Sequence, residues 1–305
     1  MPSLNALASE LAATNLLLTQ LTTRVANGET ANVAAFKAIT EHLVMDDAAI
    51  AKLMAIVTPP VIPPPPPVDP QVQWRAGMET GNLSEWEAQN NSGSAVSIAV
   101  QAAAEGIPAR TPWVMKQSVT SVGGTRMYVY SAINNIYRIG SPLYYSFWAY
   151  FPQVTTLGAG GFFNLLQIQS QGPTAMDPVW ILGLHPSAFT LRLEWWGNLQ
   201  MAGPHAGESG GIAYDQAVPI PVGRWTFIEV MVTPREDFSG AVKVWQDGAL
   251  LFDLSSVKTK YPENLVPAGT QSFMISKNAY GQGIIQLPHA HYIDDCTISL
   301  GRVPQ

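Results

Sequence analysis

Two short stretches of the chain carry side chains that could hold a sugar. Residues 164–169 read NLLQIQ and residues 275–282 read ISKNAYGQ, and both are strand candidates. Amide, hydroxyl and ammonium groups can hydrogen-bond sugar hydroxyls and neutralise sugar carboxylates. Because residues two apart on a strand share a face, we expect one concave sheet face to present them. The residues expected on that face are Arg126, Gln167, Gln169, Lys277 and Tyr280.

Catalysis by these five residues would require one of them to transfer a proton, whereas binding would not. The amide of Gln169 cannot act as a base near neutral pH, whereas the hydroxyl of Tyr280 could serve as both base and acid. Recognition through amides, hydroxyls and aromatic faces requires no proton transfer. The same residues therefore suit a groove that binds a polar ligand better than a site for acid–base catalysis.

Tryptophan and histidine residues elsewhere offer weaker candidates. Trp195 and Trp196 are adjacent, so a strand would point them to opposite faces. An outward Trp196 could stack on a sugar ring, although core packing of both rings is the interpretation that the sequence favours. His289 and His291 alternate shortly before Asp294, a pattern that could supply metal ligands. Two histidines alone are a common coincidence, so we predict no metal site and no cofactor.

Composition excludes several classes of protein. The chain has 305 residues, is 47% hydrophobic and only 12% charged, and carries a net charge of -6. It can bury a sizeable core, but it lacks the basic surface that binds nucleic acid. Cys296 is the only cysteine, so no intrachain disulfide is possible. The N-terminus lacks the pattern of a secretory signal, and no apolar run reaches the roughly 20 residues of a membrane helix. We expect no membrane insertion.

Strand patterns dominate from residue 74 to residue 305. The clearest region is 222–254, where alternating apolar residues in 225–233 precede a loop, a second strand and the hairpin signal Asp247-Gly248. Gly158 to Gly161 and Gly203 to Gly211 read as loops at the rim of a groove. This pattern predicts a mainly β, two-sheet antiparallel sandwich. The expected strands are 94–99, 113–119, 126–130, 144–151, 162–169, 179–184, 188–195, 225–233, 241–246, 249–253, 272–277 and 291–300.

The first 73 residues have a different organisation. In residues 1–57, leucines recur at heptad spacing through Leu4, Leu11 and Leu18, which predicts a short coiled-coil or helical docking segment. A monomeric helical hairpin is the alternative. Residues 58–73 form a proline-rich linker that must be extended, at about 3.1 Å per residue. We therefore predict a helical anchor, a spacer and a β-sandwich head spanning residues 74–305.

The β region resembles the concanavalin-like jelly roll of polysaccharide lyases and lectin-type domains. Residues 78–86, METGNLSEW, are similar to the opening segment of heparin-lyase-like proteins. Further matches follow in the expected order at residues 150–152, 223–225, 245–248 and 292–295. The resemblance spans residues 74 to about 302 and implies a jelly-roll sandwich.

Alginate-lyase-like relatives imply roles for individual residues. Those enzymes neutralise a uronate with Arg, Gln or Asn, take a ring proton with His or Tyr, and protonate the leaving oxygen with Tyr. The resemblance puts Gln169 where those enzymes have histidine. If the protein is a lyase, the resemblance implies catalytic roles for Tyr280, Arg126, Gln167 and Lys277. With Trp196, the ligand-binding set becomes Arg126, Tyr128, Gln167, Gln169, Lys277, Tyr280, Gln282 and Trp196.

These features together predict a carbohydrate-binding protein displayed on a particle or cell surface. Helical anchor, spacer and sugar-binding head resemble the layout of phage-type head fibre, spike or receptor-binding proteins. We expect a homo-oligomer on a virion surface or outside the cell, whose residues 1–57 contact a particle or capsid protein and whose head recognises host polysaccharide. An active lyase on uronic-acid polymers and a structural decoration protein without a ligand are the alternatives.

Overall fold

The computed structural model describes residues 72–305, apart from 93–94, 121–122, 173–174, 197–210, 269 and 286. The predictions for the helical segment 1–57 and for linker residues 58–71 lie outside the described residues. The same holds for Gly203 and the loop up to residue 210.

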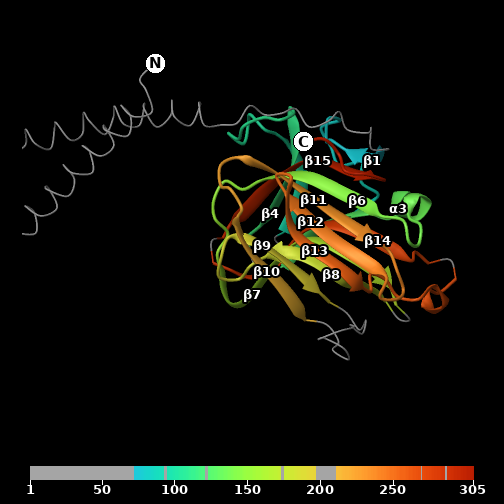
Figure 1. The fold of residues 1–305 in the computed structure, drawn as a ribbon. Coiled ribbons are helices and arrows are strands. Elements are labelled where there is room, and N and C mark those ends of the chain that lie inside the picture. Colours follow the sequence, from blue (N-terminus) through green and yellow to red (C-terminus); the bar gives the residue numbers. More distant parts are fainter. Residues whose placement is uncertain are drawn as a thin grey trace, which may run out of the picture. The chain divides into compact units, whose positions relative to one another are not determined.

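Two antiparallel sheets make up the described part of the chain, in agreement with the predicted mainly β sandwich (Figure 1). The eight-stranded sheet contains β1 (Val72–Ala76), β3 (Ala95–Gln101), β4 (Trp113–Val119), β6 (Leu143–Tyr150), β11 (Trp225–Thr233), β12 (Gly240–Gln246), β13 (Ala249–Val257) and β15 (His289–Ser299). The seven-stranded sheet contains β2 (Ala88–Asn91), β5 (Gly123–Val129), β7 (Leu157–Gln171), β8 (Met176–Leu184), β9 (Thr190–Trp195), β10 (Ile212–Pro219) and β14 (Phe273–Ile284).

The strand order places β14 and β7 near the centre of the seven-stranded sheet. Across this sheet the strands follow the order β10-β9-β8-β7-β14-β5-β2. Residues from distant parts of the chain therefore become neighbours. The helical elements of the described region are short, α3 (Ser131–Ile136) and the 3-10 turn η2 (Glu263–Leu265). No helix in the described residues is long and apolar enough to cross a membrane.

The β11 to β13 region follows its sequence pattern closely. Ile228, Val230 and Val232 are buried in the core, as their period-two spacing predicts. Asp247 and Gly248 have φ angles of 48° and 80°, and they connect β12 to β13. Positive φ at both central residues is what a type I′ hairpin turn requires. This hairpin prediction is confirmed.

The core lies between the two sheets and is built from large apolar side chains. Trp180, Trp195 and Phe163 from the seven-stranded sheet and Tyr145 and Phe147 from the eight-stranded sheet are almost fully buried. Each buried side chain of this size contributes roughly 2 to 3 kcal/mol through removal of apolar surface from water. The sandwich is therefore held by packing, and its cysteine, Cys296, is a buried free thiol.

Several secondary-structure predictions need correction. Gly158 to Gly161, expected as a rim loop, lie inside β7 because β7 continues to pair with β14 beyond Phe162. The short strands β1, β2 and β10 were not predicted, since their sequences lack a clear apolar alternation. Their pairing partners β15, β5 and β9 supply the hydrogen bonds that define them.

Candidate functional site

The candidate site lies on the face of the seven-stranded sheet that points away from the other sheet. On β14, Ile275 and Ala279 belong to the core between the sheets. Ser276, Asn278 and Tyr280 alternate with them and therefore point to the opposite face. We call this side the outer face.

The strand register extends this face across the sheet in rows. Residues directly opposite one another in paired strands share a face. One row contains Tyr280, Asn164, Gly183, Arg192 and Asp215. The next row contains Tyr128, Ser276, Gln167, Ile181 and Glu194. Arg126 and Asn278 pair between these two rows, and Gln169 lies opposite Met274 and Pro178 in a third.

Arg126 and Tyr280 form the most distinctive contact on the outer face. The guanidinium carbon of Arg126 lies 4.6 Å from the centre of the Tyr280 ring, and the ring of Phe162 lies 5.6 Å from that of Tyr280. Gly124 allows this arrangement, because a Cβ there would lie 2.2 Å from Cδ2 of Tyr280. Among the described residues, Arg126 pairs with no carboxylate. Its charge is therefore free to meet an anion.

Polar atoms at the centre of this face are buried without hydrogen-bond partners. Oγ of Ser276 and both side-chain polar atoms of Asn278 are buried and have no hydrogen-bond partner among the described residues. The amide of Gln169 donates to the amide oxygen of Gln167 at 2.7 Å. An unpaired buried polar group costs about 1 to 3 kcal/mol, so such a cluster indicates groups held ready for a ligand or water.

A charged cluster occupies the β9 and β10 side of the same face. Arg192 contacts Asp215 at 2.6 Å and Glu194 at 3.5 Å, and His185 lies 3.6 Å from Asp215. The hydrogen bond from Arg192 lowers the pKa of Asp215, whereas burial raises the pKa of Glu194. Most of the charge of Arg192 is thus already neutralised. Arg126 remains the stronger anchor for an acidic ligand.

The structure contradicts the prediction that Lys277 shares the ligand-facing surface. Lys277 pairs with Leu166, one position out of phase with Gln167, so its side chain enters the core. Its Nζ donates to Oε1 of Gln117 at 3.1 Å and lies 3.3 Å from Nε2 of His291, both on the other sheet. Burial lowers the pKa of Lys277 to about 7. A role for Lys277 in direct ligand contact is therefore wrong.

Gln169 also lies away from Tyr280, although both are on the outer face. Gln169 is opposite Met274, six residues from Tyr280 along β14, which is roughly 20 Å at about 3.3 Å per residue. The residue opposite Tyr280 is Asn164. Gln169 therefore shares the predicted face with Tyr280 but does not lie beside it.

The remaining candidate residues differ in their exposure to solvent. Gln282 is exposed and two residues beyond Tyr280, on the same side of β14. Trp196 is 48% exposed and Trp195 is buried, so core packing of both rings, the interpretation favoured from the sequence, is wrong. His289 and His291 are buried between the sheets, and burial lowers the pKa of both. No cluster of three or more potential metal ligands occurs within the described residues.

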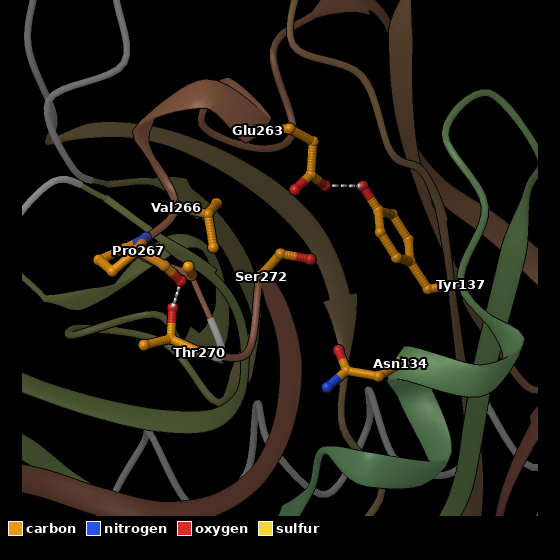
Figure 2. A pocket seen from close by; sticks show the side chains of 8 residues that line it. Asn134, Tyr137, Glu263, Val266, Pro267, Thr270 and Ser272 are labelled. Atoms are coloured by element: carbon orange, nitrogen blue, oxygen red, sulfur yellow. Dashed lines mark hydrogen bonds between the residues drawn. The ribbon is translucent and has the colours of Figure 1, made fainter.

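A separate pocket of about 470 Å³ lies near the start of β14 (Figure 2). Asn134, Tyr137, Thr270 and Ser272 help to line it, and the hydroxyl of Tyr137 donates to Glu263 at 3.2 Å. The carboxylate of Glu263 also pairs with the buried Lys260 at 2.9 Å. Since its charges are satisfied internally, this pocket has less to offer a ligand than the outer face.

Comparison with known families gives one match. A family model described as polysaccharide lyase matches residues 78–272, which is more than half of the chain. The chain belongs to the polysaccharide lyase family. Residues 78–272 include β5, β7, β8 and β9 but end just before β14, so the match covers most of the strands that form the outer face. No curated protein sequence gives a significant match.

Solved structures place this polysaccharide lyase family member in a known fold. The endo-β-1,4-glucuronan lyase from the fungus Trichoderma reesei is 14% identical, with a TM-score of 0.56 over 75% of this chain and 95% of that chain. The cellulose-induced protein Cip1 is 12% identical, with a TM-score of 0.46 over 76% of this chain and 99% of that chain. At such identity, the glucuronan lyase similarity establishes the fold alone.

The sequence interpretation missed some residues of the outer face. Ser276 and Asn278 alternate with the apolar residues of β14, and Arg192 and Glu194 alternate on β9, so period two was an available signal. Asn164 gave no such signal, because its spacing of three from Gln167 predicts opposite faces. Only the register of β7 brings these two side chains together.

Proposed function

We propose that the outer face of the seven-stranded sheet binds an acidic polysaccharide, most simply a polymer of uronic acids. The observation that carries the proposal is an arginine with no carboxylate partner among the described residues, Arg126, beside buried polar atoms of Ser276 and Asn278 that have no hydrogen-bond partner. A uronate supplies what both need. Its carboxylate pairs with a guanidinium in a planar, two-bond arrangement, and its hydroxyls bond to amides.

The aromatic rings of the face complete this chemistry. Tyr280 and Phe162 lie side by side on the outer face, with ring centres 5.6 Å apart. A sugar ring has apolar C–H faces that pack on such rings, while its edge meets the amides of Asn164 and Gln167. Membership of the polysaccharide lyase family supports a polymeric carbohydrate as the ligand class.

Binding of the full-length protein to defined polymers tests the proposal. Calorimetric titrations with alginate, glucuronan and heparin are expected to give saturable binding that weakens as salt concentration rises. Uncharged dextran serves as the control polymer and is expected not to bind. Equal binding to dextran, or no binding to any acidic polymer, would contradict the proposal.

Replacing Asn278 with leucine should separate stability from binding. The variant removes two buried polar atoms that have no partner, so we expect the free energy of unfolding to rise by about 1 to 2 kcal/mol. The same change removes a ligand contact and should weaken polysaccharide binding about tenfold. Denaturant unfolding and calorimetry measure the two effects.

Asn91 provides the matched control for this substitution. Its side-chain oxygen accepts hydrogen bonds from Oγ1 of Thr125 at 2.6 Å and from the amide of Ser97 at 3.2 Å. Asn91→Leu should therefore destabilise the fold and leave affinity unchanged. A destabilised Asn278→Leu variant would show that its side chain is a structural asparagine after all.

Lyase activity on uronic-acid polymers is the second candidate function. Family membership favours it, and so does the position of Tyr280, whose hydroxyl has no hydrogen-bond partner among the described residues and whose ring contacts Arg126. β-Elimination needs a carboxylate-neutralising group and a proton-transfer group close together. Arg126 and Tyr280 supply one of each.

We further propose that the protein is displayed on a particle, with residues 1–57 as its attachment and oligomerisation segment. The heptad leucines of that segment and the proline-rich residues 58–73 support this layout. Deleting residues 1–58 should leave a folded, soluble head with fewer subunits per oligomer, calculated from the light-scattering mass divided by the mass of the truncated chain. An unchanged number of subunits would show that the segment does not assemble the protein.

A further inference from the structure

The buried side chain of Lys277 contacts two backbone carbonyls directly behind the outer face. Its Nζ donates to the carbonyl oxygen of Leu165 at 3.0 Å and to that of Asn278 at 2.9 Å. A third donor reaches Oε1 of Gln117 at 3.1 Å. An ammonium group has three N–H donors, and these three oxygens can accept all of them, with Nε2 of His291 as a further neighbour at 3.3 Å.

The two carbonyls belong to an irregularity in the sheet that we call the Leu165 bulge. The register between β14 and β7 shifts between Lys277 and Tyr280, and the register between β7 and β8 shifts between Asn164 and Leu166. Carbonyls in such a break lose part of the regular ladder of hydrogen bonds. The ammonium of Lys277 supplies donors to the carbonyls of Leu165 and Asn278.

The Leu165 bulge decides which side chains reach the outer face. Asn164 and Gln167 are three residues apart, and a regular strand would point them to opposite faces. In β7, Leu165 and Leu166 both belong to the core, so Asn164 and Gln167 both point outward. Without the bulge, either Asn164 or the pair Gln167 and Gln169 would turn into the core.

We propose that Lys277 is a positioning residue for the outer face, because its ammonium holds the Leu165 bulge and the bulge keeps Asn164 on the same side as Gln167. Lys277 acts from inside the core and does not touch the ligand. The predicted effect of Lys277 on ligand affinity rests on the proposed function. Its predicted effect on the conformation of β7 does not.

Protonation of Lys277 provides a way to test this role. Burial lowers its pKa to about 7. The titratable groups packed near it are His289, His291 and Cys296 from β15 and Tyr145 from β6. Burial lowers the pKa of both histidines and raises the pKa of the cysteine and the tyrosine, so all four stay neutral near pH 7. A neutral lysine has two N–H donors for three oxygens, so the bulge should loosen above pH 7.

The overall stability of the fold should change with pH in the opposite direction to the stability of the bulge. In the folded protein Lys277 loses its proton near pH 7, whereas in the unfolded chain it keeps the proton up to about pH 10.4. Between these values the unfolded chain binds more protons, so this group makes stability rise with pH. Local loosening at the bulge together with rising global stability is a combination that a purely structural lysine would not produce.

Hydrogen–deuterium exchange on the full-length protein tests the strand directly. Exchange of peptides covering residues 162–168 and 278–281, corrected for intrinsic rates, should be about tenfold faster at about pH 8.5 than at about pH 6. In Lys277→Met the same peptides should exchange fast at both pH values. The matched control is Lys260→Met, which removes an equally buried lysine that pairs with Glu263 and Glu236 far from the bulge. It should keep the wild-type pH dependence.

The wild-type pH comparison needs no variant, so the test stands even if Lys277→Met fails to fold. Exchange at the bulge that is independent of pH in the wild type, or a pH dependence that survives in a folded Lys277→Met protein, would overturn the proposal. Affinity for alginate is measured in parallel and should fall above pH 7 in the wild type but not in the variant. If no acidic polymer binds at all, the proposed function fails, and exchange at the bulge still decides the role of Lys277.

Discussion

Replacing Arg126 with glutamine is expected to weaken binding of a uronic-acid polymer about 10- to 100-fold. A charge-assisted hydrogen bond to a carboxylate contributes about 1.5 to 3 kcal/mol, and glutamine keeps hydrogen bonding while removing the charge. Among the described residues Arg126 has no carboxylate partner, so its loss leaves no uncompensated acid behind. Calorimetry at low salt measures the change, and the fold should stay intact.

Lys243→Gln is the matched control for loss of one positive charge. Lys243 lies on the eight-stranded sheet and pairs with Asp253 at 2.8 Å. Its replacement should change affinity less than twofold or so, because a distant exposed charge is screened by salt. Equal losses in the two variants would mean that general charge, and not Arg126, attracts the polymer.

Replacing Tyr280 with phenylalanine is expected to remove any lyase activity while binding survives. Tyr280 is the proton-transfer group next to Arg126, and a positioned acid or base contributes about 10² to 10⁴ in rate. Binding loses one hydroxyl and should weaken at most about tenfold. Ultraviolet absorbance of unsaturated ends measures turnover. We expect wild-type turnover to be weak or absent, since Asn164, the residue opposite Tyr280, has an amide that cannot accept a proton, and Tyr280 would have to act as both base and acid.

Tyr144→Phe is a suitable control for the tyrosine substitution. Tyr144 is a tyrosine of β6 on the other sheet, where its ring stacks on Trp245 at 6.3 Å. It should leave both turnover and affinity unchanged. Robust wild-type turnover that disappears in Tyr280→Phe would favour the lyase over the binding protein. Turnover that persists in Tyr280→Phe would assign the proton transfer to another group.

Much of the fold follows from local sequence. Apolar alternation located β4 and β11 at their observed bounds, and Asp247-Gly248 located the hairpin between β12 and β13. These signals are local, because side-chain alternation and turn conformations depend on a few neighbouring residues. The sequences of β2 and β10 carry little pattern of their own, and pairing with β5 and β9 defines these strands.

The site was less predictable because it depends on register. Arg126, Tyr128, Gln167 and Tyr280 lie on the outer face as expected from spacing. Lys277 does not, since its odd position relative to Tyr280 turns it inward. A bulge adds one residue to a strand and reverses the alternation of side chains between the two faces beyond it. The residue types in 164–167 do not predict a bulge. Long-range pairing, not local preference, decides which polar side chains meet.

Hydrogen–deuterium exchange of the full-length protein with and without a uronic-acid oligosaccharide tests the central claim most directly. The account predicts slower exchange in the peptides of β5, β7 and β14 that carry Arg126, Gln167 and Asn278, with no change for an uncharged oligosaccharide of equal length. Protection confined to the eight-stranded sheet, or no protection at saturating oligosaccharide, would contradict it.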